Sequence, residues 1–341
     1  MSIYSVAKKA GVSPAAVSRY INKSGSVAPG KAELIRAAMK ELEYVPSLVR
    51  PGPRLKNRPG VRTGQIALLF LGRLKPLEMY RMPVFPILFS GVHEAVESAG
   101  LNLVVTHWPD GEQCPSIIRK GCFDGVLVMG AMPKPERLFS MLKIPAVWFF
   151  RGHSDPEGRL DHVFYDNSRI GGIAARYLVG KGCRRLCFIN PYPVHEAVKP
   201  RKKDFIRTAK DLGSEVKIFE SAEDMFGSVV EEAEIMTRKA VGGKDRCDGI
   251  FAPMDNVLLS AYNCLKFMGK TPDKEVTLIG CNNDPQFMGQ MNPRPATIDI
   301  KLDTVGKKAV EQLLIRMQFP DDKDRVEILV KPELVPAEGR A

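Results

Sequence analysis

The sequence predicts a small all-α helix-turn-helix headpiece followed by an α/β core of two doubly wound parallel-sheet lobes. Three features lead to this fold class. Two short helical patterns joined by a glycine stand near the N-terminus, a basic segment rich in proline and glycine follows, and short apolar runs then alternate with amphipathic segments. A chain of 341 residues also exceeds a single ordinary core, so several folding units are expected.

The expected headpiece begins with two short helices at residues 3–10 and 14–22. Ser13 is placed to cap the second helix, and Pro14 occupies its first position, where the missing N–H has no partner to lose. Val17 and Ile21 are four residues apart and are expected to face the core. A tight turn between two such helices suits insertion of the second into a DNA major groove, but it also suits the first hairpin of an ordinary globular domain.

The first 63 residues are strongly basic. They hold 12 Lys or Arg and three acids, a net charge of +9 out of the chain's +11, so the remaining 278 residues are nearly neutral. A small basic headpiece on a nearly neutral body is typical of a phosphate-binding domain attached to a second module. The alternative is a solvated basic face that maintains solubility.

A third helix is expected at residues 29–43, after which the composition changes. Residues 46–60 contain four prolines, two glycines and four basic side chains, which indicates an extended linker. We therefore divide the chain into a DNA-binding headpiece at residues 1–45, a linker at residues 46–63 and a core at residues 64–341.

In the core, continuous apolar runs alternate with helical segments in two series. Such runs indicate strands of parallel sheets that are buried on both faces, and two series indicate two lobes. The first lobe is expected to comprise residues 64–165 and 297–320, and the second residues 166–296 and 321–341. Ligands bind such folds where the carboxyl ends of the strands meet, so a cleft between the lobes is the expected pocket.

Several function classes find no support in the sequence. No apolar run approaches the ~20 residues of a membrane span, and the N-terminus lacks the apolar segment of a signal peptide, so no membrane partner is expected. The seven cysteines have no metal-ligand spacing, and the five histidines do not cluster. With no nucleophile elbow, P-loop or His-Glu-x-x-His motif, we expect neither an enzyme with catalytic residues nor a bound metal or cofactor.

The headpiece closely resembles the LacI family of bacterial transcription regulators. The resemblance rests on Val-Ala-Lys-Lys-Ala-Gly-Val-Ser at residues 6–13 and Val-Ser-Arg-Tyr-Ile-Asn at residues 17–22. Weaker matches recur along the core, at residues 123–128, 144–147, 252–255, 276–280 and 295–298. The family's core is similar to periplasmic sugar-binding proteins, so the resemblance implies a periplasmic-binding-protein-like fold for the two lobes.

The resemblance implies a homodimer whose recognition helices read two half-sites of a near-palindromic double-stranded DNA operator. It places Pro14, Ala15 and Arg19 at the base-reading positions, where Arg19 can form a bidentate contact with guanine. Pro14 and Ala15 can at most pack on thymine methyl groups or keep the helix close to the groove. Phosphate contacts that set the register are implied for Tyr4, Ser5, Ser13, Ser18, Asn22 and Lys31.

The linker departs from the family, in which a short hinge helix forms on DNA. Here Pro51, Gly52 and Pro53 oppose a helix. One interpretation is an extended segment that inserts Arg50 and Arg54 into a narrow A·T-rich minor groove. The other is a plain flexible tether.

The family's ligand positions map onto an effector site between the lobes. Arg201 matches an arginine that clamps polar ligand groups, Phe85 is placed to stack on a ring, and Asn282 stands where aspartate is common. Because acids are lost and Arg151 is gained, the site suits an anionic or phosphorylated ligand as an alternative to a sugar. An outward-facing Arg151 and a loss of effector sensing remain open. The complete set of implied effector residues is Phe85, Phe150, Arg151, Asp166, Arg201, Asp255 and Asn282.

The sequence therefore predicts a cytoplasmic, nucleoid-associated transcriptional regulator, expected to be a repressor. A sugar or anionic metabolite in the cleft would set its operator affinity by shifting the population of core conformations. The alternative is an architectural or effector-independent DNA-binding protein with a vestigial ligand cleft. A solute receptor is disfavoured, since it would need a signal peptide and no basic headpiece.

Overall fold

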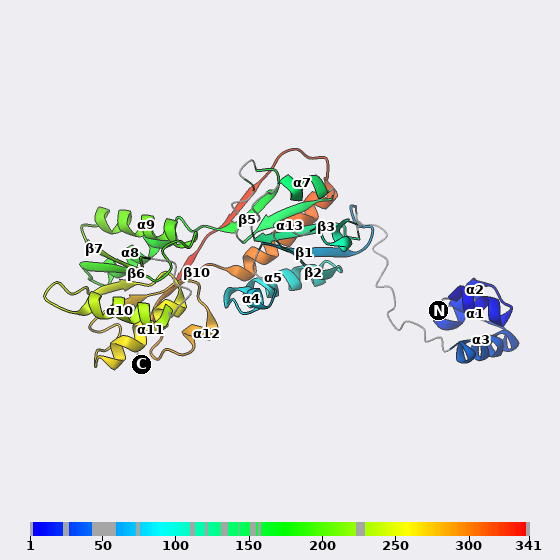
Figure 1. Cartoon of the computed structure of the whole chain (residues 1–341), viewed down its shortest axis with the longest axis horizontal. Coiled ribbons are helices and arrows are strands. Elements are labelled where there is room, and N and C mark those ends of the chain that lie inside the picture. Colours follow the sequence, from blue (N-terminus) through cyan, green and yellow to red (C-terminus); the bar gives the residue numbers. More distant parts are fainter. Residues whose placement is uncertain are drawn as a thin grey trace. The chain divides into compact units, whose positions relative to one another are not determined.

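The computed structural model describes residues 3–22, 27–42, 59–72, 76–109, 113–119, 122–130, 136–142, 144–150, 155, 158–222 and 229–338. Three residues of the predicted sites, Arg50, Arg54 and Arg151, lie outside these described residues. The chain divides into two compact units, residues 1–55 and 56–341 (Figure 1). No described helix is both long and apolar enough to cross a bilayer.

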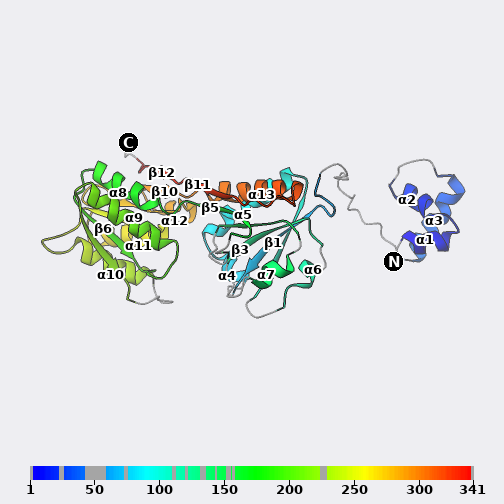
Figure 2. The ribbon, with the colours of Figure 1, turned by 90° about the horizontal axis from the view of Figure 1, so that it is seen from above.

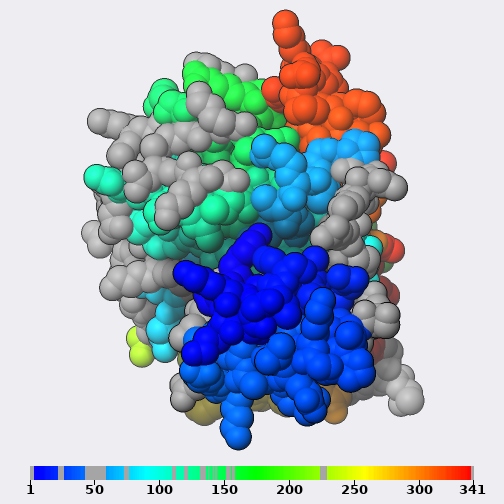
Figure 3. Space-filling model, turned by 90° about the vertical axis from the view of Figure 1, so that its right-hand side faces the viewer, coloured from blue at the N-terminus to red at the C-terminus, as the bar shows by residue number. Residues whose placement is uncertain are grey.

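The first unit is a bundle of three helices, α1 (Ile3–Ala10), α2 (Pro14–Asn22) and α3 (Pro29–Glu41), which form one closely packed body (blue in Figure 3). Gly11 has a φ of 63° and so supplies the turn between α1 and α2. The Ser13 hydroxyl accepts a hydrogen bond from the Ala16 amide at 3.3 Å, as predicted for the cap of α2. The helices enclose a small apolar core, made of Val6, Ala7, Ala10, Val17, Ile35 and Ala38.

The first lobe of the core is built on a six-stranded parallel sheet in the order β11-β5-β4-β3-β1-β2. In the register of its centre, Leu68 lies opposite Val105 on one side and Leu127 on the other. Figure 2 shows α5 and α13 on one face of this sheet and α6 and α7 on the other. The elements are β1 (Gln65–Leu71), α4 (Pro76–Tyr80), α5 (Val84–Ser98), β2 (Asn102–Trp108), α6 (Ser116–Arg119), β3 (Gly125–Gly130), α7 (Glu136–Met141), β4 (Ala146–Phe149), β5 (Asp161–Tyr165), α13 (Leu302–Gln318) and β11 (Glu327–Val330).

The second lobe is built on a four-stranded parallel sheet in the order β7-β6-β8-β9, and a two-stranded sheet of β10 and β12 lies beside it. Figure 1 shows α8 and α9 on one face of the parallel sheet and α10 and α11 on the other. The elements are α8 (Ile170–Gly180), β6 (Arg185–Asn190), α9 (Val198–Asp211), β7 (Glu215–Glu220), α10 (Val229–Val241), β8 (Gly249–Phe251), α11 (Asp255–Phe267), β9 (Thr277–Ile279), α12 (Pro285–Met288), β10 (Thr297–Asp299) and β12 (Glu333–Val335).

Two expected lobe boundaries differ from the structure. Residues 321–341 were expected in the second lobe, but β11 pairs in parallel with β5 and so belongs to the first sheet. β11 is an edge strand in which exposed and half-buried residues alternate, so it lacks the continuous apolar run that marks a central strand. Conversely β10, expected in the first lobe, pairs with β12 and is bridged to the chain that follows β9.

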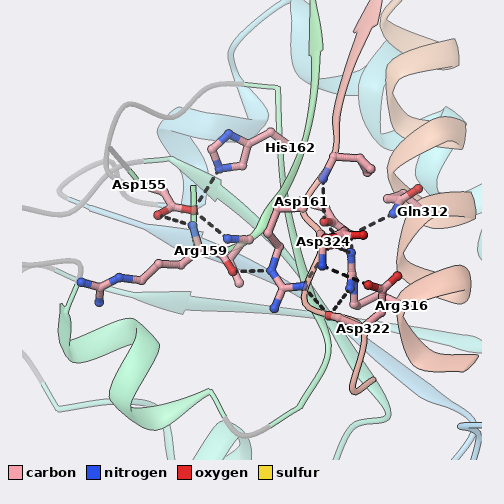
Figure 4. A network of polar contacts seen from close by, with 11 residues as sticks. Asp155, Arg159, Asp161, His162, Gln312, Arg316, Asp322 and Asp324 are labelled. Carbon is pink, nitrogen blue, oxygen red and sulfur yellow. Dashed lines mark hydrogen bonds and ion pairs between the residues drawn. The ribbon is translucent and has the colours of Figure 1, made fainter. Parts of the chain in front are cut away.

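A buried ion pair joins α13, β5 and the chain that leads to β11 (Figure 4). The Asp161 carboxylate accepts hydrogen bonds from Arg316 Nε and Nη2 at 2.9 and 2.7 Å, and from Gln312 Nε2 at 2.8 Å. The Arg316 guanidinium also donates to the backbone carbonyls of Asp322 and Asp324. This network holds the C-terminal half of α13 against the first sheet.

Candidate functional site

In the headpiece, α2 presents its predicted base-reading residues to solvent. Pro14, Ala15 and Arg19 are exposed, whereas Ala16 and Val17 are buried against the other two helices. This side of α2 is therefore free to enter a DNA groove, and its apolar side anchors it in the bundle.

Five of the six predicted phosphate-contacting residues of the headpiece are exposed or half-buried. Tyr4, Ser5, Ser13 and Lys31 are exposed and Ser18 is half-buried, while Asn22 is the last residue of α2. They come from α1, from α3, from α2 itself and from the turn that precedes it. Such an arrangement suits a helix that reads bases while its neighbours contact the flanking phosphates.

A cavity of about 330 Å³ opens between the two lobes of the core. This volume lies within the range of small-molecule sites. Of the predicted effector residues, the cavity brings together Phe150, Arg201 and Asn282. The remaining lining residues are Met82, Pro83, Val84, Tyr165, Tyr192, His195, Ala197, Met254, Asn256, Asp284 and Phe287.

Arg201 is the one arginine or lysine among the described residues that line this cavity. It lies in the first turn of α9 and is 1% exposed. Its Nε donates to Asn167 Oδ1 at 2.9 Å, and its Nη1 donates to the Pro253 carbonyl and, at 3.3 Å, to Asn282 Oδ1. Among the described residues it forms no ion pair, and its Nη2 has no hydrogen-bond partner. A buried guanidinium with a donor to spare is a natural anchor for a ligand oxygen.

The turn after β9 carries the polar side of the cavity. Asn282 and Asn283 have φ of 116° and 55°, a left-handed conformation that reverses the chain and brings Asn282 beside Arg201. Asp284 then caps α12, since its Oδ1 accepts from the Gln286 amide at 2.9 Å. Its Oδ2 is buried and has no hydrogen-bond partner in the described part of the chain, and burial raises the pKa of this carboxyl group.

Three predicted effector residues do not line the cavity. Asp255 is buried behind the wall, where its carboxylate accepts from the Thr297 hydroxyl at 2.7 Å and the Asp284 amide at 2.8 Å, and burial raises its pKa to about 6. Phe85 is buried in an aromatic cluster with Phe70 and Tyr80, and its amide donates to the carbonyl of the lining residue Met82 at 2.9 Å. Asp166 accepts from the Ser168 amide at 3.0 Å near the start of α8.

Sequence reasoning missed several lining residues, above all Asp284. The signal for Asp284 was present, because an acid directly before a proline is typical of a helix start, here that of α12. The aromatic residues Tyr165, Tyr192 and Phe287 carry no motif, and only the fold brings them to one cavity. Asn256 is held there by a hydrogen bond of 3.0 Å from its Nδ2 to the Tyr192 hydroxyl.

Comparison with known proteins gives two matches to family models. Residues 2–47 match the model "Bacterial regulatory proteins, lacI family", and residues 175–338 match the model "Periplasmic binding protein-like domain". Among curated relatives, the HTH-type transcriptional repressor PurR of Pectobacterium carotovorum is 28% identical over 345 residues, which is 98% of this chain and 95% of that protein.

Solved structures share the fold over the whole length. The cellobiose complex of the transcriptional regulator CelR is 22% identical with a TM-score of 0.64, and the match covers 99% of both chains. The lac repressor dimer bound to operator and the anti-inducer ONPF is 16% identical with a TM-score of 0.68, and the match covers 99% of this chain and 98% of that one. These likenesses support the order of headpiece, linker and two-lobed core.

Proposed function

We propose that the chain is a member of the lacI family of bacterial regulatory proteins, and that it represses transcription at operators whose affinity a small-molecule effector sets. One observation carries the proposal. The same chain joins a headpiece that exposes Arg19 on its second helix to a core whose cavity holds the buried guanidinium of Arg201. Such a protein would have one surface for DNA and one cavity for a ligand. No catalytic step is part of this proposal.

The cavity supports regulation because it draws residues from both lobes. Met82, Phe150 and Tyr165 come from the first lobe, and Arg201 and Asn282 come from the second. A ligand that touches both sides stabilises the arrangement of the lobes in which both contacts are made. A coupling free energy of about 1–3 kcal/mol would change operator affinity by about 5- to 150-fold.

Helix α13 offers a physical path from the cavity to the linker. Asn282 is bridged to Asp299 in β10, and α13 begins three residues later, at Leu302. At the other end of α13, a Cβ on Gly60 would lie 2.1 Å from the Met317 carbonyl, so the end of the linker packs directly on this helix. A helix of 17 residues spans about 25 Å. We propose that a shift of the Asn282 turn reaches the linker through α13.

The proposed partners are a double-stranded operator and a second copy of the chain, because a near-palindromic site needs two headpieces. The proposed effector is a sugar or a related metabolite, which agrees with the cellobiose bound to the similar CelR. The site of action would be the bacterial chromosome in the cytoplasm. Arg50 and Arg54 remain proposed as minor-groove contacts of the linker.

The proposal is tested by sequencing the host DNA fragments that the purified full-length protein retains. We expect enrichment of near-palindromic sites, and loss of this preference in Arg19→Ala, since a bidentate contact to guanine contributes about 1–3 kcal/mol of discrimination. Lys239→Ala, which removes an exposed charge from the core, is the matched control and should retain the preference. Diffuse, salt-sensitive binding that is equal in all three proteins would instead favour the architectural alternative.

A further inference from the structure

We propose that the outer edge of the first sheet, at β11, joins two copies of the chain by antiparallel pairing about a two-fold axis at Leu329. The two six-stranded sheets then continue into one another through their β11 strands. The inference does not rest on the proposed function, which calls for two headpieces but names no surface of the core that joins two copies.

The first argument is the direction of the backbone groups of β11. The strand lies at the end of its sheet (Figure 1), and the Val326 and Val330 carbonyls accept hydrogen bonds from the β5 side at 2.9 and 3.0 Å. Because the peptide groups of a strand alternate in direction, the amides and carbonyls of Glu327, Leu329 and Lys331 point away from β5. Within the described ranges, these groups form no hydrogen bond. An edge of this kind is a template for a further strand.

The second argument is the charge of the side chains on this edge. Glu327 and Lys331 are exposed, and neither forms an ion pair with a described residue. They are about 13 Å apart along one extended chain, so they do not pair within one copy. When two β11 strands run antiparallel about Leu329, Glu327 of each copy lies opposite Lys331 of the other, and two ion pairs form. A register shifted by two residues loses both pairs, so the charges specify this register.

The third argument is the apolar surface beside this edge. The end of α13 and the strand that follows it expose four large apolar side chains, Ile315, Phe319, Val326 and Leu329. Hydrogen bonds from Arg316 tie the end of α13 to the chain that leads to β11. Leu329 is 48% exposed in one copy, and pairing of the two edges covers it.

Charges on an edge strand can also serve only to keep other strands away. On this edge, however, the two charges have opposite signs and are placed symmetrically about Leu329, so a second copy neutralises both of them. Self-complementarity of this kind is what a two-fold contact between identical surfaces requires. The partner that fits this surface is therefore a second copy of the chain.

The first test cross-links the full-length protein in the absence of DNA. On the axis, position 329 faces its own copy, and the Cα atoms of such a hydrogen-bonded pair are about 5.5 Å apart, a distance that a disulfide can bridge. Leu329→Cys, oxidised with diamide, should therefore form a covalent dimer on a non-reducing gel. Glu327→Cys is the matched control on the same edge, because its two copies lie about 13 Å apart and should not be linked. The parent protein gives the background from the seven native cysteines.

The second test reverses the charges and measures self-association by sedimentation velocity. Glu327→Lys and Lys331→Glu each place like charges opposite one another at both pairs, so each should raise the Kd of association about tenfold. The double variant restores both pairs with exchanged signs and should regain the parental Kd.

Three results would each overturn the inference. They are equal cross-linking of Leu329→Cys and Glu327→Cys, a Kd that neither single reversal raises, and a double variant that does not regain the parental Kd. The last result would show that the charges only protect the edge. The operator test above depends on Arg19 in the headpiece, so it decides the proposed function separately.

Discussion

Replacement of Gly171 by alanine should drive α9 away from α8 and disturb Arg201 in the process. A Cβ at this position would lie 2.1 Å from the Arg201 carbonyl oxygen and 2.3 Å from the Phe205 amide nitrogen. Since carbon and oxygen atoms of neighbouring helices approach to about 3.3 Å, the methyl group requires α9 to move by about 1 Å. Both obstructing atoms belong to the backbone, so no side-chain rotation can relieve the contact.

The expected cost follows from two opposing effects. Overpacking of this kind costs about 1–3 kcal/mol, and a contact with backbone belongs at the upper end. Replacement of a glycine within a helix by alanine stabilises the folded state by about 0.5–1 kcal/mol, which offsets part of this cost. We therefore expect the second lobe to lose about 2 kcal/mol of unfolding free energy, measured as a lower urea midpoint followed by circular dichroism.

The same displacement should weaken ligand binding. The hydrogen bond from Arg201 Nη1 to Asn282 is already 3.3 Å long, and a further 1 Å would break it. Affinity for the effector should fall at least tenfold. Gly180→Ala is the matched control, because this glycine lies in the same helix and a Cβ there would meet no described atom within 4 Å, so stability should be kept or slightly raised. Equal urea midpoints for Gly171→Ala and the parent would refute the reasoning.

Three further changes have defined outcomes. Asp161→Ala leaves the Arg316 guanidinium buried without its carboxylate partner, so the free energy of unfolding should fall by about 3–5 kcal/mol. This should appear as a large drop in Tm, and a Tm within a degree of that of the parent would contradict the prediction. The pKa of Asp255 is raised from 3.8 to about 6, so its contribution to stability is full below pH 4 and is lost as the pH rises through 6. Asp255→Asn should therefore gain about 2 kcal/mol relative to the parent between pH 4 and pH 7 in urea titrations, and a constant difference would argue against the shift. Ser13→Ala removes the cap of α2 and should lower headpiece stability by about 1 kcal/mol in thermal melts, whereas an unchanged headpiece melt would show that the cap is dispensable.

The parallel sheets could be predicted from the sequence because their central strands are buried on both faces. All residues of β1 after Gln65 are buried, so the strand appears as an unbroken apolar run. The start of α2 could also be predicted from the sequence, since Ser13 and Pro14 determine it locally. β11 could not be placed in this way, because an edge strand at the end of a long crossover depends on its partner β5 rather than on its own sequence.

The cavity was harder to predict because position along the chain does not determine where a side chain points. Arg201 and Phe150 line it, but Asp255 begins a helix whose packing turns its carboxylate away from the cavity and toward Thr297. Phe150 itself has a φ of 68°, a backbone conformation that a sequence pattern does not reveal for an aromatic residue.

The turn after β9 shows what this limit means for function. In the sequence alone, Asn282 stands where the family commonly has aspartate. This replacement indicates a loss of hydroxyl recognition and favours an anionic ligand. In the structure, Asn282 accepts a hydrogen bond from Arg201, and the chain reversal at Asn282 and Asn283 brings the next residue, Asp284, into the cavity wall. The ligand chemistry of the cavity is therefore set by the spatial arrangement of its lining groups rather than by the residue type at any single family position.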